Sequence, residues 1–137
     1  MIMMIVGSGI SALQDCLHGT VFEVWLARAC GAKVGKECYL AGLIVEYDLL
    51  SVGDHVAIGS GCDTTGHTVE NMVVKLAPTR IGDGAALLPG SFAMPGSVIE
   101  DEAVLMEHTQ VLKGETVPAR EVWAGMPASG CKPVRVA

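Results

Sequence analysis

The sequence predicts an all-β protein in which units of six residues coil into a parallel β-helix. Mostly apolar residues recur at every sixth position in two series. The series are Val34, Leu40, Glu46, Val52, Ile58 and Thr64, and then Ile81, Leu87, Ala93, Ile99, Leu105, Val111 and Val117. A period of six matches neither the repeat of a helix nor the alternation of a simple strand. It matches a short strand followed by a corner, and three such units make one triangular coil of about 18 residues.

The composition agrees with this fold. Half of the 137 residues are hydrophobic, yet only 4% are aromatic, and 17 are glycine. A triangular prism has a narrow interior, which suits aliphatic side chains better than aromatic ones. We expect the sixth-position residues to point inward and the glycines to serve the tight corners.

The two series differ in phase, because Thr64 and Ile81 are separated by one six-residue unit and eleven further residues. This excess predicts a loop that projects from one corner. Residues 43–50, with Glu46 at an expected inward position, predict an irregular first coil. The predicted organisation is a leader of uncertain order at 1–19 and one β-helix domain at 20–137, with a helix at 21–30, coils at 34–69 and 81–116, a loop at about 64–80 and a tail at 117–137 that folds back over the last coil.

A short helix precedes the coils. Phe22, Trp25, Leu26 and Ala29 fall at helical spacing, and Gly31 can end the helix. Because an open stack of repeats needs a cover at its end, we expect this helix to cap the first coil.

Charge and hydropathy exclude several classes of protein. The net charge is −6, and nine scattered lysines and arginines make no basic stripe, so we expect no nucleic-acid partner. No apolar run is long enough to span a membrane, and the start lacks the features of a signal peptide. Five cysteines form no CxxC pair and are odd in number, which is typical of buried thiols in a reducing compartment. We therefore expect a cytoplasmic protein.

Several segments resemble known proteins. Residues 122–128, VWAGMPA, resemble the closing segment of hexapeptide-repeat acyltransferases. The segments HGTVFEVWLARACGAKVGKECYL, GHTVENMVVKLAPTRIGDGA and VLKGETVP are similar to the C-terminal β-helix domain of nonribosomal-peptide-synthetase-like proteins of the polylysine synthetase type. The resemblance covers about residues 20–137 and implies a left-handed β-helix. It also implies an acyltransferase, either stand-alone or part of a larger synthetase that carries adenylation, carrier and membrane segments.

The resemblance implies a catalytic residue. In hexapeptide acyltransferases a histidine near the projecting loop is the general base, and His67 follows Gly66 at the start of that loop. Glu70 or Glu107 would orient it, and of these we select Glu70. Met72 stands where the synthetase-like relatives usually carry arginine.

The co-substrate implied by the resemblance is a thioester of coenzyme A or of a carrier protein's phosphopantetheine arm, not bound tightly. Its phosphates and chain would meet Lys113, Gly114, Gly125, Lys132 and Arg135. We expect a homotrimer, because flat apolar faces favour association and the resembling families are mostly threefold.

Two other functions stay open. The chain can be a non-catalytic β-helix that serves as a scaffold or assembly module, since a fold does not imply an activity. A γ-class carbonic anhydrase shares this fold and holds zinc with three histidines, but the chain has no HxxxxH pair. We therefore expect no metal.

Overall fold

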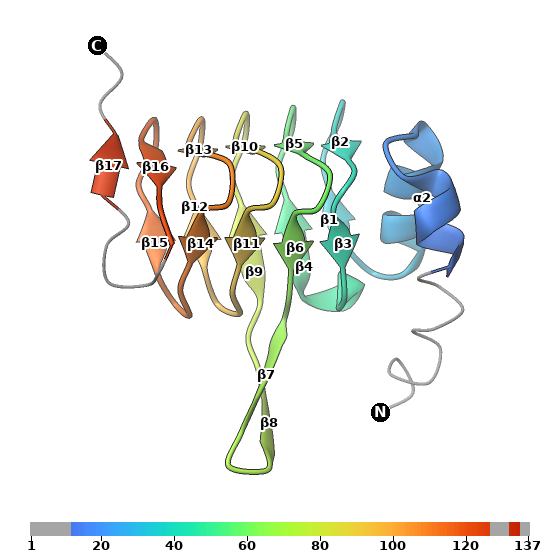
Figure 1. The fold of residues 1–137 in the computed structure, drawn as a ribbon. Helices are drawn as coiled ribbons and strands as arrows, with labels where there is room; N and C mark the ends of the chain where they lie inside the picture. Colours follow the sequence, from blue (N-terminus) through green and yellow to red (C-terminus); the bar gives the residue numbers. More distant parts are fainter. Residues whose placement is uncertain (1–11, 127–131, 135–137) are drawn as a thin grey trace.

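The computed structural model describes residues 12–126 and 132–134, which form a left-handed parallel β-helix with helices at one end (Figure 1). Residues 12–17 are helical and precede the labelled elements. In chain order, these are α2 (Val21–Ala29), β1 (Lys33–Val34), β2 (Tyr39–Leu40), β3 (Leu43–Ile44), the 3-10 turn η1 (Tyr47–Leu49), β4 (Leu50–Val52), β5 (Ala57–Ile58), β6 (Asp63–Thr64), β7 (His67–Glu70), β8 (Val73–Leu76), β9 (Thr79–Ile81), β10 (Ala86–Leu87), β11 (Phe92–Ala93), β12 (Val98–Ile99), β13 (Val104–Leu105), β14 (Gln110–Val111), β15 (Thr116–Val117), β16 (Val122–Ala124) and β17 (Lys132–Val134).

Three sheets form the sides of the prism, and the strands that form the coils pair in parallel. Their orders are β1-β4-β9-β12-β15, β2-β5-β10-β13-β16 with β17 added at the end, and β3-β6-β11-β14. Most paired residues lie 18 positions apart along the chain, as Val98 and Thr116 do. Across the insertion the separation is 29, as between Ser51 and Arg80. The eleven extra residues belong to the antiparallel hairpin β7–β8, which projects from the stack (Figure 1).

The sixth-position side chains fill the interior in three columns. Nearly all are buried, and Ile58, Ile99 and Leu105 are wholly inaccessible to solvent. The columns are Val34, Val52, Ile81, Ile99 and Val117; Leu40, Ile58, Leu87, Leu105 and Trp123; and Ile44, Thr64, Ala93 and Val111. Each column lies on the inner face of one sheet. The six-residue period of the sequence is therefore the spacing of the residues that fill the core.

The first coil departs from the predicted series. Ile44, not Glu46, pairs with Thr64 and is buried. The chain reaches this inward position two residues earlier than the period predicts. The two residues gained become part of the longer connection through η1 to β4. A carboxylate in the apolar interior would be left without hydration, which is a large free-energy cost. The slip places an isoleucine inside and leaves Glu46 at the side of the prism.

Glycines serve two different purposes, only one of which we expected. Corner residues adopt left-handed backbone angles, and the corner columns mix glycine with other residues, as at His55, Gly84 and Glu102. The corners therefore tolerate side chains. By contrast Gly53 and Gly82, which follow inward residues, have no positive φ. A Cβ on Gly82 would lie 2.7 Å from the backbone nitrogen of Asp101 and collide with its carboxylate.

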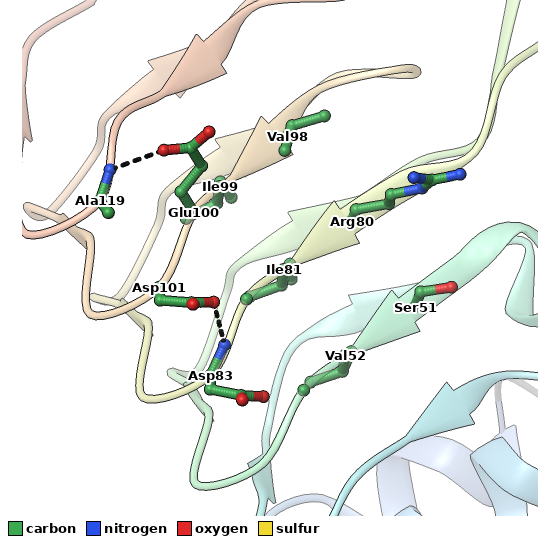
Figure 2. A pocket seen from close by; sticks show the side chains of 12 residues that line it. Ser51, Val52, Arg80, Ile81, Asp83, Val98, Ile99, Glu100, Asp101 and Ala119 are labelled. Atoms are coloured by element: carbon green, nitrogen blue, oxygen red, sulfur yellow. Dashed lines mark hydrogen bonds between the residues drawn. The ribbon is translucent and has the colours of Figure 1, made fainter.

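A ladder of aspartates explains these close approaches. Asp101 Oδ1 accepts the backbone N–H of Asp83 at 2.9 Å, which is the hydrogen bond drawn in Figure 2. Asp83 Oδ1 in turn accepts the backbone N–H of Asp54 at 2.8 Å. Asp54 Oδ1 accepts that of Lys36 at 2.7 Å. Each carboxylate thus satisfies a backbone donor of the preceding coil at one edge of the prism. The ladder borders a shallow groove of about 510 Å³ along β4, β9 and β12.

The helix α2 packs against the first coil through a different face from the one that carries Phe22 and Trp25. Val24 and Ala27 of α2 are buried, whereas Phe22 and Trp25 are exposed. The buried face of α2 is made by Glu23, Val24 and Ala27, which follow one another at helical spacing. The helix ends near the predicted residue, at Ala29.

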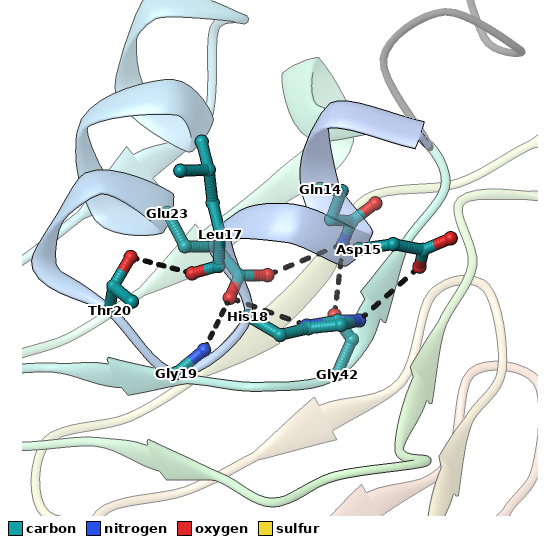
Figure 3. A network of polar contacts seen from close by, with 8 residues as sticks. All are labelled: Gln14, Asp15, Leu17, His18, Gly19, Thr20, Glu23 and Gly42. Atoms are coloured by element: carbon teal, nitrogen blue, oxygen red, sulfur yellow. Dashed lines mark hydrogen bonds and ion pairs between the residues drawn. The ribbon is translucent and has the colours of Figure 1, made fainter.

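A buried carboxylate joins the cap to the first coil (Figure 3). Glu23 Oε2 accepts the Gly19 N–H at 3.0 Å and lies 3.4 Å from His18 Nδ1. Gln14 Nε2 donates to the Gly42 carbonyl at 2.9 Å and lies 3.4 Å from Glu23 Oε1. Burial raises the pKa of the Glu23 carboxyl, although these partners oppose the shift. Residues 12–17, placed within the leader by the sequence, are therefore part of the cap.

The C-terminal end continues the period further than we expected. The tail was predicted to begin at residue 117, but β16 keeps the parallel register, and Trp123 takes the inward position next to Leu105. Trp123 therefore closes the interior, and its Nε1 donates to Glu121 Oε2 at 2.8 Å. The chain then folds back, and β17 pairs antiparallel to β16.

Among the described residues, no helix is long and apolar enough to cross a membrane.

The aspartate ladder predicts which glycines are indispensable. Gly82→Ala should lower the free energy of unfolding by about 3 kcal/mol, because the neighbouring backbone cannot move aside. Gly114→Ala, at a corner where an added Cβ meets no atom within 4 Å, should lose only about 1 kcal/mol through its left-handed backbone angle. Denaturant unfolding measures both. Equal losses would contradict the role given to the ladder.

The raised pKa of Glu23 predicts a pH dependence of stability. The folded protein holds this proton more tightly than the unfolded chain, so its stabilising contribution is present at low pH and lost as the pH rises through the raised pKa. The melting temperature of the wild type minus that of Glu23→Gln should therefore fall as the pH is raised from about 4 to about 8. The ionisable side chains that face Glu23 include His18, which also contacts Asp15, and Tyr47, whose pKa burial raises to about 12. The control is Glu37→Gln, which neutralises an exposed carboxylate and should give a melting-temperature difference from the wild type that does not fall with pH in this way. If the difference between the wild type and Glu23→Gln is the same at every pH, the prediction is refuted.

Candidate functional site

A histidine–carboxylate pair lies where the hairpin leaves the prism. His67 is the first residue of β7, and its Nδ1 makes a short hydrogen bond with Oε1 of Glu46. Oε2 of Glu46 accepts the backbone N–H of Gly66 at 2.7 Å. The Glu46 side chain is 16% exposed and that of His67 is 33% exposed. Two groups from different coils thus form one partly buried unit at the side of the prism.

Local backbone geometry brings this pair together. Glu46 directly precedes η1, and the two-residue slip of the first coil turns it away from the interior. A Cβ on Gly66 would lie 2.9 Å from Cβ of Leu49 and 3.2 Å from that of Glu46, so only glycine allows the irregular coil to approach the hairpin so closely. The Ala77 N–H donates to the Gly66 carbonyl at 2.9 Å and closes the hairpin base.

The hydrogen bond determines the chemistry available to His67. A carboxylate only accepts hydrogen bonds, so the contact with Glu46 places a proton on Nδ1. In the neutral imidazole, Nε2 then carries the lone pair and can accept a proton from another group. The pair is therefore a base with an oriented ring and a counter-charge.

Glu70, predicted to orient His67, has other partners. Its carboxylate contacts Nζ of Lys75 at 2.8 Å, Nζ of Lys113 in a closer ion pair, and Oγ1 of Thr68 at 3.5 Å. Among the described residues, no hydrogen bond or ion pair joins Glu70 to His67. Glu107 is exposed on a late coil. The residue that orients His67 is therefore Glu46, not the Glu70 that the sequence suggested.

The hairpin has two chemically distinct faces, because alternate residues of a strand point to opposite sides. Strand pairing places His67 opposite Leu76 and Val69 opposite Val74, which makes one face apolar beside the histidine. Thr68 lies opposite Lys75, and Glu70 opposite Val73, which makes the other face mostly polar. At the tip, Met72 is 95% exposed.

The predicted co-substrate residues are only partly gathered. Lys113 and Gly114 lie together at a corner between β14 and β15, next to the hairpin, and they line a cleft of about 400 Å³ with Leu76 and Pro95. Gly125 follows β16, and its carbonyl accepts the Gln110 N–H at 3.2 Å. Lys132 belongs to β17, next to Ala124 in the register. Arg135 lies outside the described residues.

The part of the chain that the structure describes holds no group of three or more histidine, cysteine, aspartate or glutamate side chains that could bind a metal ion.

Glu46 could have been identified from the sequence by one signal. It is the only charged residue in the two six-residue series, and it lies in the stretch predicted to be irregular. Its contact with His67, however, depends on a two-residue slip that the series does not show.

Comparison with curated proteins finds a relative by sequence. No protein-family model matches the chain. Over 113 residues, 82% of this chain, the sequence is 30% identical to the delta-poly-L-ornithine synthetase of Acinetobacter baumannii (strain AB307-0294). The chain spans about 8% of the length of that synthetase, so the similarity concerns one segment of a much longer protein.

Comparison with solved structures identifies the fold. A hexapeptide-repeat-containing acetyltransferase from Vibrio cholerae O1 biovar eltor, complexed with acetyl coenzyme A, matches with a TM-score of 0.69 and 15% identity, covering 95% of this chain and 86% of that one. A maltose O-acetyltransferase from Clostridium difficile 630 matches at 0.65 and 16%, covering 98% and 87%. A galactoside acetyltransferase in complex with coenzyme A matches at 0.59 and 18%, covering 96% and 78%. The predicted fold, the left-handed β-helix of hexapeptide-repeat proteins, is confirmed.

Proposed function

We propose that this chain is an acyltransferase domain that moves an acyl group from a thioester to an amine or a hydroxyl group. The observation that carries the proposal is the His67–Glu46 pair at the base of the hairpin, because it supplies an oriented base at the side of the prism. Support comes from the fold, since two similar structures contain coenzyme A or acetyl coenzyme A.

In the proposed reaction, Nε2 of His67 accepts a proton from the acceptor as its nitrogen or oxygen attacks the thioester carbonyl. A bond forms between the acceptor and the carbonyl carbon, giving a tetrahedral intermediate with a negative oxygen. The intermediate then expels the thiolate, and the imidazolium returns the proton to sulfur. Glu46 keeps the ring oriented and stabilises its positive charge between the two steps. Backbone N–H groups of the coils would stabilise the oxyanion.

The co-substrate in this proposal is coenzyme A, or the phosphopantetheine arm of a carrier protein. The synthetase relative favours a carrier, because a domain within a large synthetase can receive an acyl group from a neighbouring domain. We also infer that the chain works within a larger synthetase or complex, on the same similarity.

Substitution of the pair tests the catalytic proposal. His67→Ala should reduce kcat for acyl transfer by about 10²–10⁴-fold and leave the affinity for coenzyme A unchanged, because the ring acts on the acceptor's proton. Glu46→Gln should reduce kcat less, since the amide oxygen can still accept the Nδ1–H but carries no charge. The assay follows release of free thiol from acetyl coenzyme A, with amino acids bearing side-chain amines and with sugars as acceptors.

The matched control is His55→Ala. Nδ1 of His55 lies 3.1 Å from Oε2 of the exposed Glu37, at a corner of the prism outside the candidate site. If the wild type binds no coenzyme A at millimolar concentration and transfers no acyl group, the chain is instead a β-helix scaffold or assembly module. Full activity of His67→Ala would refute the role of this histidine even in an active enzyme.

We propose further that the chain forms a homotrimer in which the apolar hairpin face contacts a neighbouring copy. Val69, Val74 and Leu76 are more than half exposed on this face, beside His67. Burial of such side chains stabilises association by about 25 cal/mol for each Å² removed from water.

Sedimentation tests the trimer. The wild type should sediment at roughly three times the monomer mass at micromolar concentration. Val69→Ser/Val74→Ser removes the apolar cross-strand pair and should shift the equilibrium toward smaller species by weakening contacts between copies. Ala57→Ser, on the outer face of a prism sheet, serves as a control for the change in polarity. A wild-type monomer at this concentration would contradict the proposal.

A further inference from the structure

The polar face of the hairpin contacts the prism at one charged cluster. Glu70 of β7 receives two ammonium groups, one from Lys75 on the same hairpin and one from Lys113 at the corner between β14 and β15. The pair with Lys75 joins the two strands of the hairpin. The pair with Lys113 crosses from the hairpin to the stack, so it is the one that restrains the hairpin as a whole.

The hairpin also approaches the stack through small residues at this point. An added Cβ on Gly96 would lie 3.3 Å from Cβ of Ala77, just beyond the end of β8. Between these contacts lies the cleft of about 400 Å³, with Pro95 and Leu76 in its walls and both lysines at its edge. The cleft is therefore bounded by the hairpin on one side and by a corner of the coils on the other.

The charges at the cleft do not balance. In these ion pairs two ammonium groups face one carboxylate, so the side chains of Glu70, Lys75 and Lys113 together carry one positive charge. The Glu70 carboxylate occupies the position that an external anion would take between two ammonium groups. The Lys113 and Glu70 side chains remain 42% and 36% exposed, so a dissolved anion can reach them and compete.

We propose that Glu70 is a positioning residue that holds the hairpin against the prism through its ion pair with Lys113, a contact that we call the latch. We propose that the phosphate groups of the thioester donor compete with Glu70 for Lys113 and so open the latch. This inference rests on the proposed acyl transfer. In the latched state the carboxylate restrains the hairpin strand that begins with His67, three residues away. When a phosphate group takes Lys113, Glu70 keeps Lys75 alone, and the hairpin is free to adjust over the donor.

The test combines hydrogen exchange of the backbone amides of residues 67–76 with calorimetry of coenzyme A and of inorganic pyrophosphate. Glu70→Gln should speed exchange of the hairpin severalfold without ligand, because an exposed ion pair restrains only modestly. It should also bind both probes about threefold to fivefold more tightly, because the competing carboxylate is gone. Lys113→Gln should speed exchange similarly but bind both probes more weakly than the wild type does.

Two further variants separate a latch from a general loss of charge. In the double variant Glu70→Gln/Lys113→Gln, exchange should be no faster than in Glu70→Gln alone, because that substitution already removes the contact with Lys113. Glu102→Gln breaks a comparable exposed ion pair, in which Oε2 of Glu102 lies 3.4 Å from Nε of Arg120 at a corner away from the hairpin. It should change neither hydrogen exchange of the hairpin nor the affinity for coenzyme A and pyrophosphate. In the acyl-transfer assay, Glu70→Gln should lower KM for the donor, because the competing carboxylate is gone. It should also lower kcat, because the pair with Lys75, which still restrains the hairpin when the donor is bound, is lost as well.

Unchanged exchange in both single variants would overturn the latch. Faster exchange with unchanged or weaker affinity for pyrophosphate in Glu70→Gln would overturn the competition between Glu70 and the ligand. If the wild type and the variants neither bind coenzyme A nor transfer an acyl group, the proposed function fails. The exchange rates and the pyrophosphate affinities then still show whether Glu70 and Lys113 restrain the hairpin.

Discussion

The register between successive coils is the constraint on which the rest of the structure depends. Each strand is only two or three residues long in the coils, so no strand is stable alone, and every one relies on parallel partners in the neighbouring coils. A residue and its neighbour one coil away must therefore have compatible size and charge. Ile81 and Ile99 meet this demand inside the prism, and the aspartates that receive backbone N–H groups meet it at the edge. Gly82 follows from the same demand, since the next coil's aspartate occupies its side-chain space.

Departures from this register produce the candidate site. An insertion of eleven residues projects a hairpin between β6 and β9, and a two-residue slip in the first coil turns Glu46 outward. Neither change alone would make a base with a counter-charge: the insertion supplies Gly66 and His67, and the slip supplies their carboxylate. The regular coils hold these irregular segments in place because their own positions are overdetermined by pairing on both sides.

Three carboxylates show how the environment decides what a glutamate does. Glu23 is a buried residue of the cap helix, where loss of hydration raises the pKa of its carboxyl and its oxygens accept hydrogen bonds from Gly19 and Gln14. Glu46 is mostly buried and hydrogen-bonds to Nδ1 of an imidazole, which suits it to orient a base. Glu70 is partly exposed between two lysines, where an external anion can replace it. The residue type is the same, and the differences come from burial and from which donors the fold brings near.

The sequence by itself determined the coil. Its period placed the inward residues from Ile81 to Val117, the eleven-residue excess predicted the projecting loop, and Gly66 and His67 were placed at the start of that loop. These features are encoded locally or at a fixed spacing, so they can be read along the chain. Only the tertiary structure decided that Ile44 replaces Glu46 inside, that Val24 and Ala27 rather than the aromatic residues pack the cap, and that Glu70 faces Lys113. Each of these depends on which of several neighbouring residues best fits a space formed by distant coils, and a repeat in the sequence carries no information about that fit.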